Sequence, residues 1–141
     1  MINPRTAVLS LVWLVTCISA AQAENRLEPG LWRAETRMDG QLLSEPAETC
    51  ISEDGARTSN GADDAVRQAI IDETVRNGCG ASDIVIEGAR IGFTTSCQGI
   101  KSVTDITYAG TRYAGTLTTQ LPSGSKTLDI AGEWIGACGS P

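Results

Sequence analysis

The sequence predicts one mostly β domain: an antiparallel meander of about seven strands, closed or half closed into a barrel, with one helix between the second and third strands. Three observations predict this β-rich α+β class. Short segments alternate apolar and polar side chains, glycine-containing turns separate these segments, and only one stretch has helical periodicity. Residues 24–141 are enough for a single domain with its own core, and no internal repeat or linker divides them.

Residues 1–23 have the order of a secretory signal peptide. Arg5 is the only charge, residues 7–19 are apolar, and Ala21 and Ala23 are the small residues that a signal peptidase reads. We therefore expect cleavage after Ala23, export, and a periplasmic protein.

Two alternatives to a cleaved signal involve the membrane. The apolar run is too short to cross about 30 Å of hydrocarbon as a helix. Cys17 is a candidate for lipid attachment, but Thr16 is a poor match to the Gly, Ala or Ser that lipoprotein signals usually place before the cysteine. No stretch of residues 24–141 is apolar enough to predict a transmembrane segment.

The first two strands are predicted as a hairpin. Residues 31–38 alternate, and one face carries Trp32, Ala34, Thr36 and Met38. Asp39-Gly40 is a favourable two-residue turn, because both residues tolerate a positive φ. The return strand spans residues 41–51. It contains Pro46, which has no N–H to donate, so we expect an edge strand or an interrupted one.

The single helix is predicted over residues 62–77, after a polar loop at residues 52–61. Val66 and Ile70 lie four residues apart on one face, which we expect to pack on the sheet. Asn60 is the expected N-cap, and Gly78 can adopt the left-handed conformation that ends the helix.

The rest of the chain reads as strand, turn and strand. The predicted strands are residues 83–87, 90–97, 100–108, 112–121 and 125–138. By alternation, Tyr108 and Trp134 face the same side as Trp32, so these three aromatic residues are candidates for a core or for a pocket. We expect Trp32 and Trp134 to be buried together where the first and last strands meet.

Four cysteines remain after the signal: Cys50, Cys79, Cys97 and Cys138. In a small exported domain they predict two disulfides, whereas a zinc site would need C-x-x-C spacing or histidine, and the chain has neither. The sequential pairing joins Cys50 with Cys79 and Cys97 with Cys138, but Cys97 and Cys138 would lie at opposite ends of strands that two others separate.

The alternative pairing is favoured by the meander. Cys79 and Cys97 flank one hairpin centred on Gly88, and Cys50 meets Cys138 if the first strand pairs with the last. Strict alternation places Cys79 on the wrong face, so this pairing requires a bulge beside Gly80.

Several of these features together resemble the DUF3617 family of exported bacterial proteins. They are Pro29-Gly30-Leu31-Trp32 after a signal, the four cysteines, and the ending of residues 132–138, GEWIGAC. The resemblance covers essentially residues 24–141 and implies a Gram-negative periplasmic setting. The family has no assigned function, so the resemblance implies no catalytic residue.

Composition excludes several classes of function. The chain has 17 acidic and 11 basic residues and no histidine. It therefore lacks the basic footprint of a nucleic-acid binder and any histidine for a triad or metal site.

The acidic side chains do not predict a catalytic or metal site either. Adjacent carboxylates, at Glu53-Asp54, Asp63-Asp64 and Asp72-Glu73, read as solvated loop and helix positions. Residues 52–64 are rich in oxygen ligands but lack the order of an EF-hand loop. We expect no enzyme, no catalytic residue, no cofactor and no metal.

Two non-catalytic functions remain. The first is a structural or interaction domain of the cell envelope with an unidentified partner. The second is a module that binds a small apolar ligand inside the barrel or cupped sheet, where Ala34, Gly115 and Gly132 would leave space beside the three aromatic residues.

Overall fold

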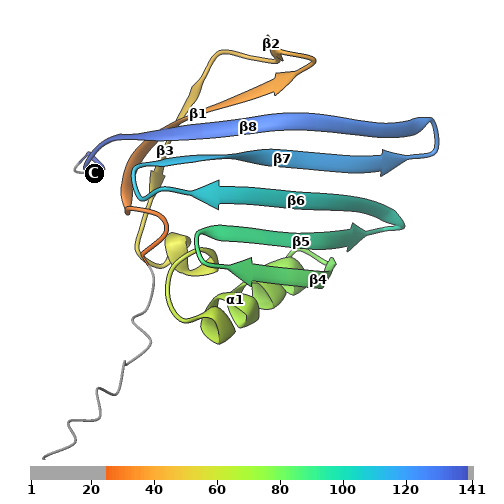
Figure 1. Cartoon of the computed structure of the whole chain (residues 1–141), viewed down its shortest axis with the longest axis horizontal. Helices are drawn as coiled ribbons and strands as arrows, with labels where there is room; N and C mark the ends of the chain where they lie inside the picture. Colours follow the sequence, from red (N-terminus) through yellow and green to blue (C-terminus); the bar gives the residue numbers. More distant parts are fainter. Residues whose placement is uncertain (1–24, 140–141) are drawn as a thin grey trace, which may run out of the picture.

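The computed structural model describes residues 25–139, which form one antiparallel sheet of eight strands with one α-helix and a short 3-10 helix (Figure 1). The elements are β1 (Gly30–Met38), β2 (Gln41–Leu42), β3 (Ala47–Ile51), η1 (Gly55–Thr58), α1 (Asp63–Arg76), β4 (Gly80–Glu87), β5 (Arg90–Cys97), β6 (Ile100–Tyr108), β7 (Arg112–Leu121) and β8 (Gly124–Gly136). The predicted signal and Cys17 lie outside the described residues.

The predicted meander is confirmed, but the sheet is not closed, so the predicted closed or half-closed barrel is not confirmed. The strand order is β2-β1-β8-β7-β6-β5-β4, so the first strand does pair with the last, and β3 pairs with β1 beside β2. The sheet stays open because β4 and the β2/β3 edge lie on opposite sides of it (Figure 1). At the β4 edge, Arg67 of α1 donates to the carbonyl oxygen of Ile84 at 2.8 Å, which occupies an acceptor of that strand.

The return strand of the first hairpin is interrupted, as Pro46 predicted. It forms β2 and β3, both paired with β1 and separated by residues 43–46. This split gives eight strands rather than about seven, and it places the helix between β3 and β4 instead of between the second and third strands.

The helix forms nearly where the sequence predicts it, but its predicted cap is wrong. Ala62 is the N-cap residue, and no side chain caps the start of the helix. Asn60 instead exchanges two hydrogen bonds with the backbone of Leu27, its Oδ1 accepting from the N–H at 2.8 Å and its Nδ2 donating to the carbonyl at 2.7 Å. After the helix, Gly78 has the expected positive φ of 74°.

The sheet has a covered inner face and an open outer face. We call inner the side on which η1 and α1 pack. Trp32 packs there with Leu27 and Ala56, while Val66 and Ile70 of α1 pack on β5. Partly buried Tyr108 contacts both groups and joins them into one core.

Residues 25–29 form an N-terminal arm that is fastened across the end of the sheet. Leu27 forms a parallel bridge with Gly110. Arg26 is only 4% exposed, and its guanidinium donates to the carbonyl of Gly88 at 2.6 Å, to that of Ser59 at 3.0 Å and to Asp63 at 2.7 Å. This buried cation therefore ties the arm to the β4–β5 turn and to the start of α1.

The cysteines form the two pairs that the meander favoured. Cys50 is bonded to Cys138 and Cys79 to Cys97, with Cα atoms 5.5 and 4.5 Å apart.

The bulge that the second pair requires lies in β4, but it is not beside Gly80. Ser82 opposes Thr94 and Val85 opposes Gly92, so the extra residue falls between Ser82 and Val85. Asp83 has a φ of 52° there, because a left-handed residue accommodates the added position.

Candidate functional site

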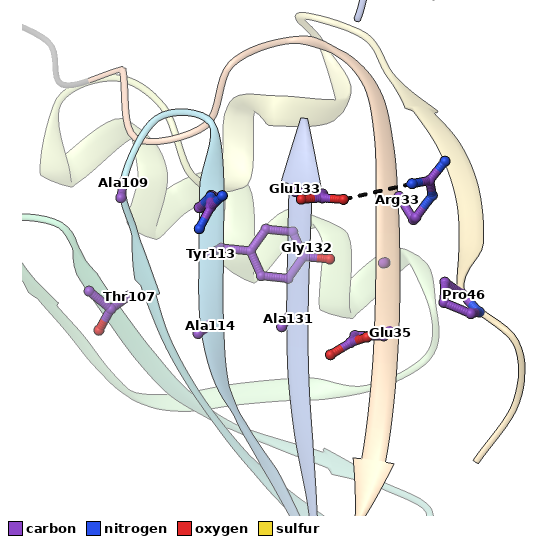
Figure 2. A pocket seen from close by; sticks show the side chains of 12 residues that line it. Arg33, Glu35, Pro46, Thr107, Ala109, Tyr113, Ala114, Ala131, Gly132 and Glu133 are labelled. Atoms are coloured by element: carbon purple, nitrogen blue, oxygen red, sulfur yellow. Dashed lines mark ion pairs between the residues drawn. The ribbon is translucent and has the colours of Figure 1, made fainter. Parts of the chain in front are cut away.

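The outer face of the sheet contains an open trough of about 510 Å³ over β6, β7, β8 and β1 (Figure 2). We call it the outer trough. It is lined by Arg33, Ala34, Glu35, Pro46, Thr107, Ala109, Arg112, Tyr113, Ala114, Ala131, Gly132 and Glu133. Its volume falls within the range of about 300–1,000 Å³ that is usual for small-molecule sites.

Strand register explains why small side chains form the floor of the outer trough. Ala114 of β7 lies opposite Ala131 of β8, and Ala131 lies opposite Glu35 of β1. In an antiparallel pair, directly opposed side chains point to the same face. The methyl groups of Ala114 and Ala131 therefore lie side by side, and the surface is hollow where longer charged side chains surround them.

Charged side chains form the walls. Arg33 is paired with Glu48 at 3.1 Å and with Glu133 at 3.8 Å, and Figure 2 shows Glu133 extended towards Arg33. Glu35 is paired with Arg37 at 3.0 Å.

Arg112 is the exception among these charged residues. It opposes Glu133 in the register, but no ion pair involves it in the described part of the chain. The outer trough thus holds one unpaired guanidinium.

The three aromatic residues singled out from the sequence have different environments. Trp32 is 1% exposed and belongs to the core, and its indole N–H donates to the carbonyl oxygen of Glu28 at 2.8 Å. Tyr108 also belongs to the core.

Trp134 lies opposite Trp32 in the register, but it is 36% exposed, so the expectation that both indoles are buried together is wrong. Its ring lies over Gly30, where a Cβ would collide with the indole nitrogen. The indole N–H donates to the carbonyl oxygen of Pro29 at 3.1 Å. This residue covers the start of β1 rather than filling the core.

The small inner residues do not enclose an empty cavity. A Cβ at Gly132 would collide with the ring of Tyr113, which occupies that space and packs against Trp32 in a tilted arrangement with ring centroids 5.4 Å apart. A Cβ at Gly115 would collide with the backbone of β6 at Asp105 and Ile106. These glycines therefore permit close packing, and the predicted interior pocket is not supported.

Burial and pairing shift the acidity of groups on the two faces in opposite directions. Burial raises the pKa of Tyr108, and a hydrogen bond to Ser59 only partly opposes this. Burial also raises the pKa of Tyr113. On the outer face, the Arg90 guanidinium hydrogen-bonds both carboxylate oxygens of Asp105 and lowers the pKa of that carboxyl.

The acidic pairs considered for catalysis are dispersed. Glu53-Asp54 lies in an exposed loop, and Asp72-Glu73 lies on an exposed part of α1. Asp63 binds Arg26. Among residues 25–139, no cluster of three or more His, Cys, Asp or Glu side chains is arranged to hold a metal. The helix in this part of the chain is neither long nor apolar enough to cross a bilayer.

Sequence reasoning missed both Arg26 and the outer trough. Arg26 lies in a short polar segment with no periodicity, so no local pattern indicates that it is buried. The outer trough had a weak signal, since Ala114 and Ala131 are small residues on the polar faces of two strands that become neighbours in the meander. Only the register brings them together.

Comparison with known proteins identifies a family. The model of a family described as "Protein of unknown function (DUF3617)" matches residues 27–138. No curated protein and no solved structure matches the chain.

Proposed function

The chain belongs to the DUF3617 family, and we propose that it is an exported, non-catalytic interaction domain of the cell envelope that binds its partner or ligand at the outer trough. The observation that supports this proposal most directly is the outer trough itself. It combines about 510 Å³ of open space, a floor of alanine methyl groups and charged walls on a rigid sheet.

The alternative, a small apolar ligand inside the fold, loses its support where the sheet is packed. Tyr113 fills the space beside Gly132, and Trp32 is closed off from solvent. If the protein binds a ligand, the outer face is therefore the better candidate for the binding site than the inner face.

A non-catalytic role is favoured by the arrangement of the acidic groups. Glu35 and Glu133 are the carboxylates that line the outer trough, and each is paired with an arginine. A general acid or base at neutral pH usually needs a carboxyl shifted by burial or by a second carboxylate. Paired, half-exposed carboxylates favour electrostatic recognition instead.

Export is supported by the order of residues 1–23 and by two disulfides, which form and persist in oxidising compartments. The intact mass of protein isolated from a periplasmic extract tests it. We expect a chain that begins at Glu24 and has no free thiol. A mass that retains Met1, or that carries a diacylglyceryl group on Cys17, would contradict cleavage after Ala23.

The outer trough is tested by filling it. We expect protein purified from the periplasm to retain a bound molecule in native mass spectrometry, and Ala131→Phe to abolish this added mass. Gln120→Phe is the matched control, because Gln120 is exposed on the same face beyond the outer trough. Equal loss in both variants, or an added mass that survives Ala131→Phe, would locate binding elsewhere.

A further inference from the structure

We propose that the outer trough recognises an amphiphilic monocarboxylate, with the carboxylate on Arg112 and the apolar body on Ala114, Ala131 and Pro46. This inference rests on the proposed function, because it names the ligand class of the same site.

The ion pairs of the outer trough leave one arginine, Arg112, available to bind a negatively charged group. Arg33 is engaged by Glu48 and Glu133, and Glu35 is engaged by Arg37. Arg112 has no ion pair among residues 25–139, although the chain as a whole carries an excess of carboxylates. A guanidinium presents a planar set of donors that matches a carboxylate, so Arg112 is an unfilled anion partner.

The same pattern disfavours a dianion. Glu35 and Glu133 line the outer trough with Arg112. A phosphate monoester would bring two negative charges close to these two carboxylates, whereas a carboxylate brings one. The site therefore favours a monoanion over a dianion with the same apolar body.

The remaining lining indicates an apolar body. Ala114 and Ala131 present adjacent methyl groups, and Pro46, from the segment between β2 and β3, lies at the side of the trough near β1 (Figure 2). Contact with these groups removes apolar ligand surface from water at about 25 cal/mol per Å². A ligand with a polar body would lack this contribution from the alanine and proline surface.

Octanoate is a suitable probe, with octanol and octyl phosphate as analogues that carry another head group on an alkyl chain one methylene longer, so the longer chain works against the expected preference. We expect octanoate to cause saturable shifts in the amide NMR signals of Ala114, Ala131 and Gly132. We expect Arg112→Gln to weaken this binding at least about tenfold, the value of one charge-assisted hydrogen bond of about 1.4 kcal/mol. Octanol and octyl phosphate should both bind more weakly than octanoate.

Lys101→Gln is the matched control. Lys101 is an exposed cation of β6, outside the lining of the outer trough, and its replacement removes the same charge from the protein. It should leave octanoate binding unchanged. Ala131→Phe should abolish binding by filling the site, which keeps the test independent of the arginine variant.

Three results would overturn the inference. They are absence of saturable shifts with octanoate at millimolar concentration, equal binding of octanol, and equal weakening by Lys101→Gln and Arg112→Gln. If octanoate fails while a periplasmic molecule is still displaced by Ala131→Phe, the ligand class is wrong and the proposed function stands. If no molecule is displaced, the proposed function fails as well.

Discussion

The inner and outer faces of this sheet come from the same strands but are stabilised by different means. On the inner face, Trp32, Val66 and Ile91 are at most 2% exposed and are covered by η1, α1 and the N-terminal arm. On the outer face, ion pairs such as Arg33 with Glu48 keep about half of each side chain in solvent. Exposed pairs of this kind contribute little stability, typically about 0–1 kcal/mol.

This difference indicates at which positions a substitution should cost little stability. Inner positions are held by packing, so a change there disturbs several neighbours at once. Outer positions touch few atoms, so side chains there can be arranged for recognition without weakening the fold.

The two disulfides should contribute unequally to stability. By register, Cys50 lies on the outer side with Glu48, and its bond to Cys138 spans 88 residues, whereas the Cys79–Cys97 bond spans 18. Loop-closure entropy predicts losses of about 4.5 and 3 kcal/mol when each bond is replaced by a pair of serines.

Urea unfolding of the two double variants checks this order. Removal of the Cys50–Cys138 bond, which closes the longer loop, should cause the larger loss of stability although Cys50 lies on the outer side. The reason is that a disulfide acts mainly by constraining the unfolded chain. A greater loss for the Cys79–Cys97 replacement would show that native packing around α1, rather than loop length, sets the contribution.

The two paired tryptophans offer a sharper comparison. Trp32→Ala should reduce the free energy of unfolding by about 3–5 kcal/mol, because it opens a cavity among Leu27, Ala56 and Tyr113. Trp134→Ala should cost about 1–2 kcal/mol, since its indole is more than one-third exposed and loses one hydrogen bond to Pro29.

Chemical denaturation of both variants, with the wild type as reference, tests this asymmetry. Equal losses would mean that Trp134 is as much a part of the core as Trp32. That outcome would restore the sequence-based expectation that the two residues anchor the sheet together.

Arg26 and Arg33 compare a buried arginine side chain with a half-exposed one. Arg26→Ala should cost about 2–3 kcal/mol, because it leaves the carbonyl groups of Ser59 and Gly88 without their donor. Arg33→Ala on the outer face should cost less than about 1 kcal/mol, although Arg33 has two carboxylate partners.

Thermal unfolding distinguishes the two. If Arg33→Ala destabilises as much as Arg26→Ala, the outer-face charges form a stabilising network rather than a recognition surface.

Alternation along the chain predicted several inward side chains correctly, but it did not predict burial, because Trp134 shares the inward alternation and is 36% exposed. It assigned Trp32 and Tyr108 to one face, and the antiparallel register then carried Tyr113 and Ile91 to the same side. Pro46 and Gly78 were also informative, because a missing N–H and a positive φ have few structural solutions. These signals are local, so one sequence is enough to read them.

The features that sequence reasoning missed depend on contacts between distant segments. Asn60 looked like a helix cap because its neighbours are helical, but Leu27, 33 residues away, takes both of its amide groups. Gly132 suggested empty space, whereas Tyr113 of the adjacent strand fills it. Closure into a barrel depends on whether the two edge strands of the sheet pair with each other, which local alternation does not report. The hydrogen bond of Arg67 to the β4 edge is likewise a contact that no periodicity in the sequence predicts.

The smallest expected effects are changes in stability with pH. Groups on the inner face should cause a loss of stability at high pH, and groups on the outer face should cause one at low pH. The folded pKa of Tyr108 and Tyr113 is raised by burial. The contribution of these tyrosines to the free energy of unfolding is therefore intact below about pH 10, the pKa of tyrosine in the unfolded chain. It is lost as the pH rises above that value, because the tyrosines of the unfolded chain ionise first. The folded pKa of Asp105 is lowered by Arg90, so its contribution is present above the unfolded value of about 3.9 and is lost as the pH falls below it.

Each face has a direct measurement. Tyr108 and Tyr113 are the only tyrosines in the chain, so absorbance at the phenolate band of native protein against urea-unfolded protein reports their titration without labels. Unfolding free energies measured towards low pH should fall less steeply for Asp105→Asn than for the wild type, while Tyr108→Phe should follow the wild type there and differ only in alkali. Native tyrosines that titrate with the unfolded midpoint would mean that the inner face admits water, which would remove the contrast between a closed inner face and an open outer one.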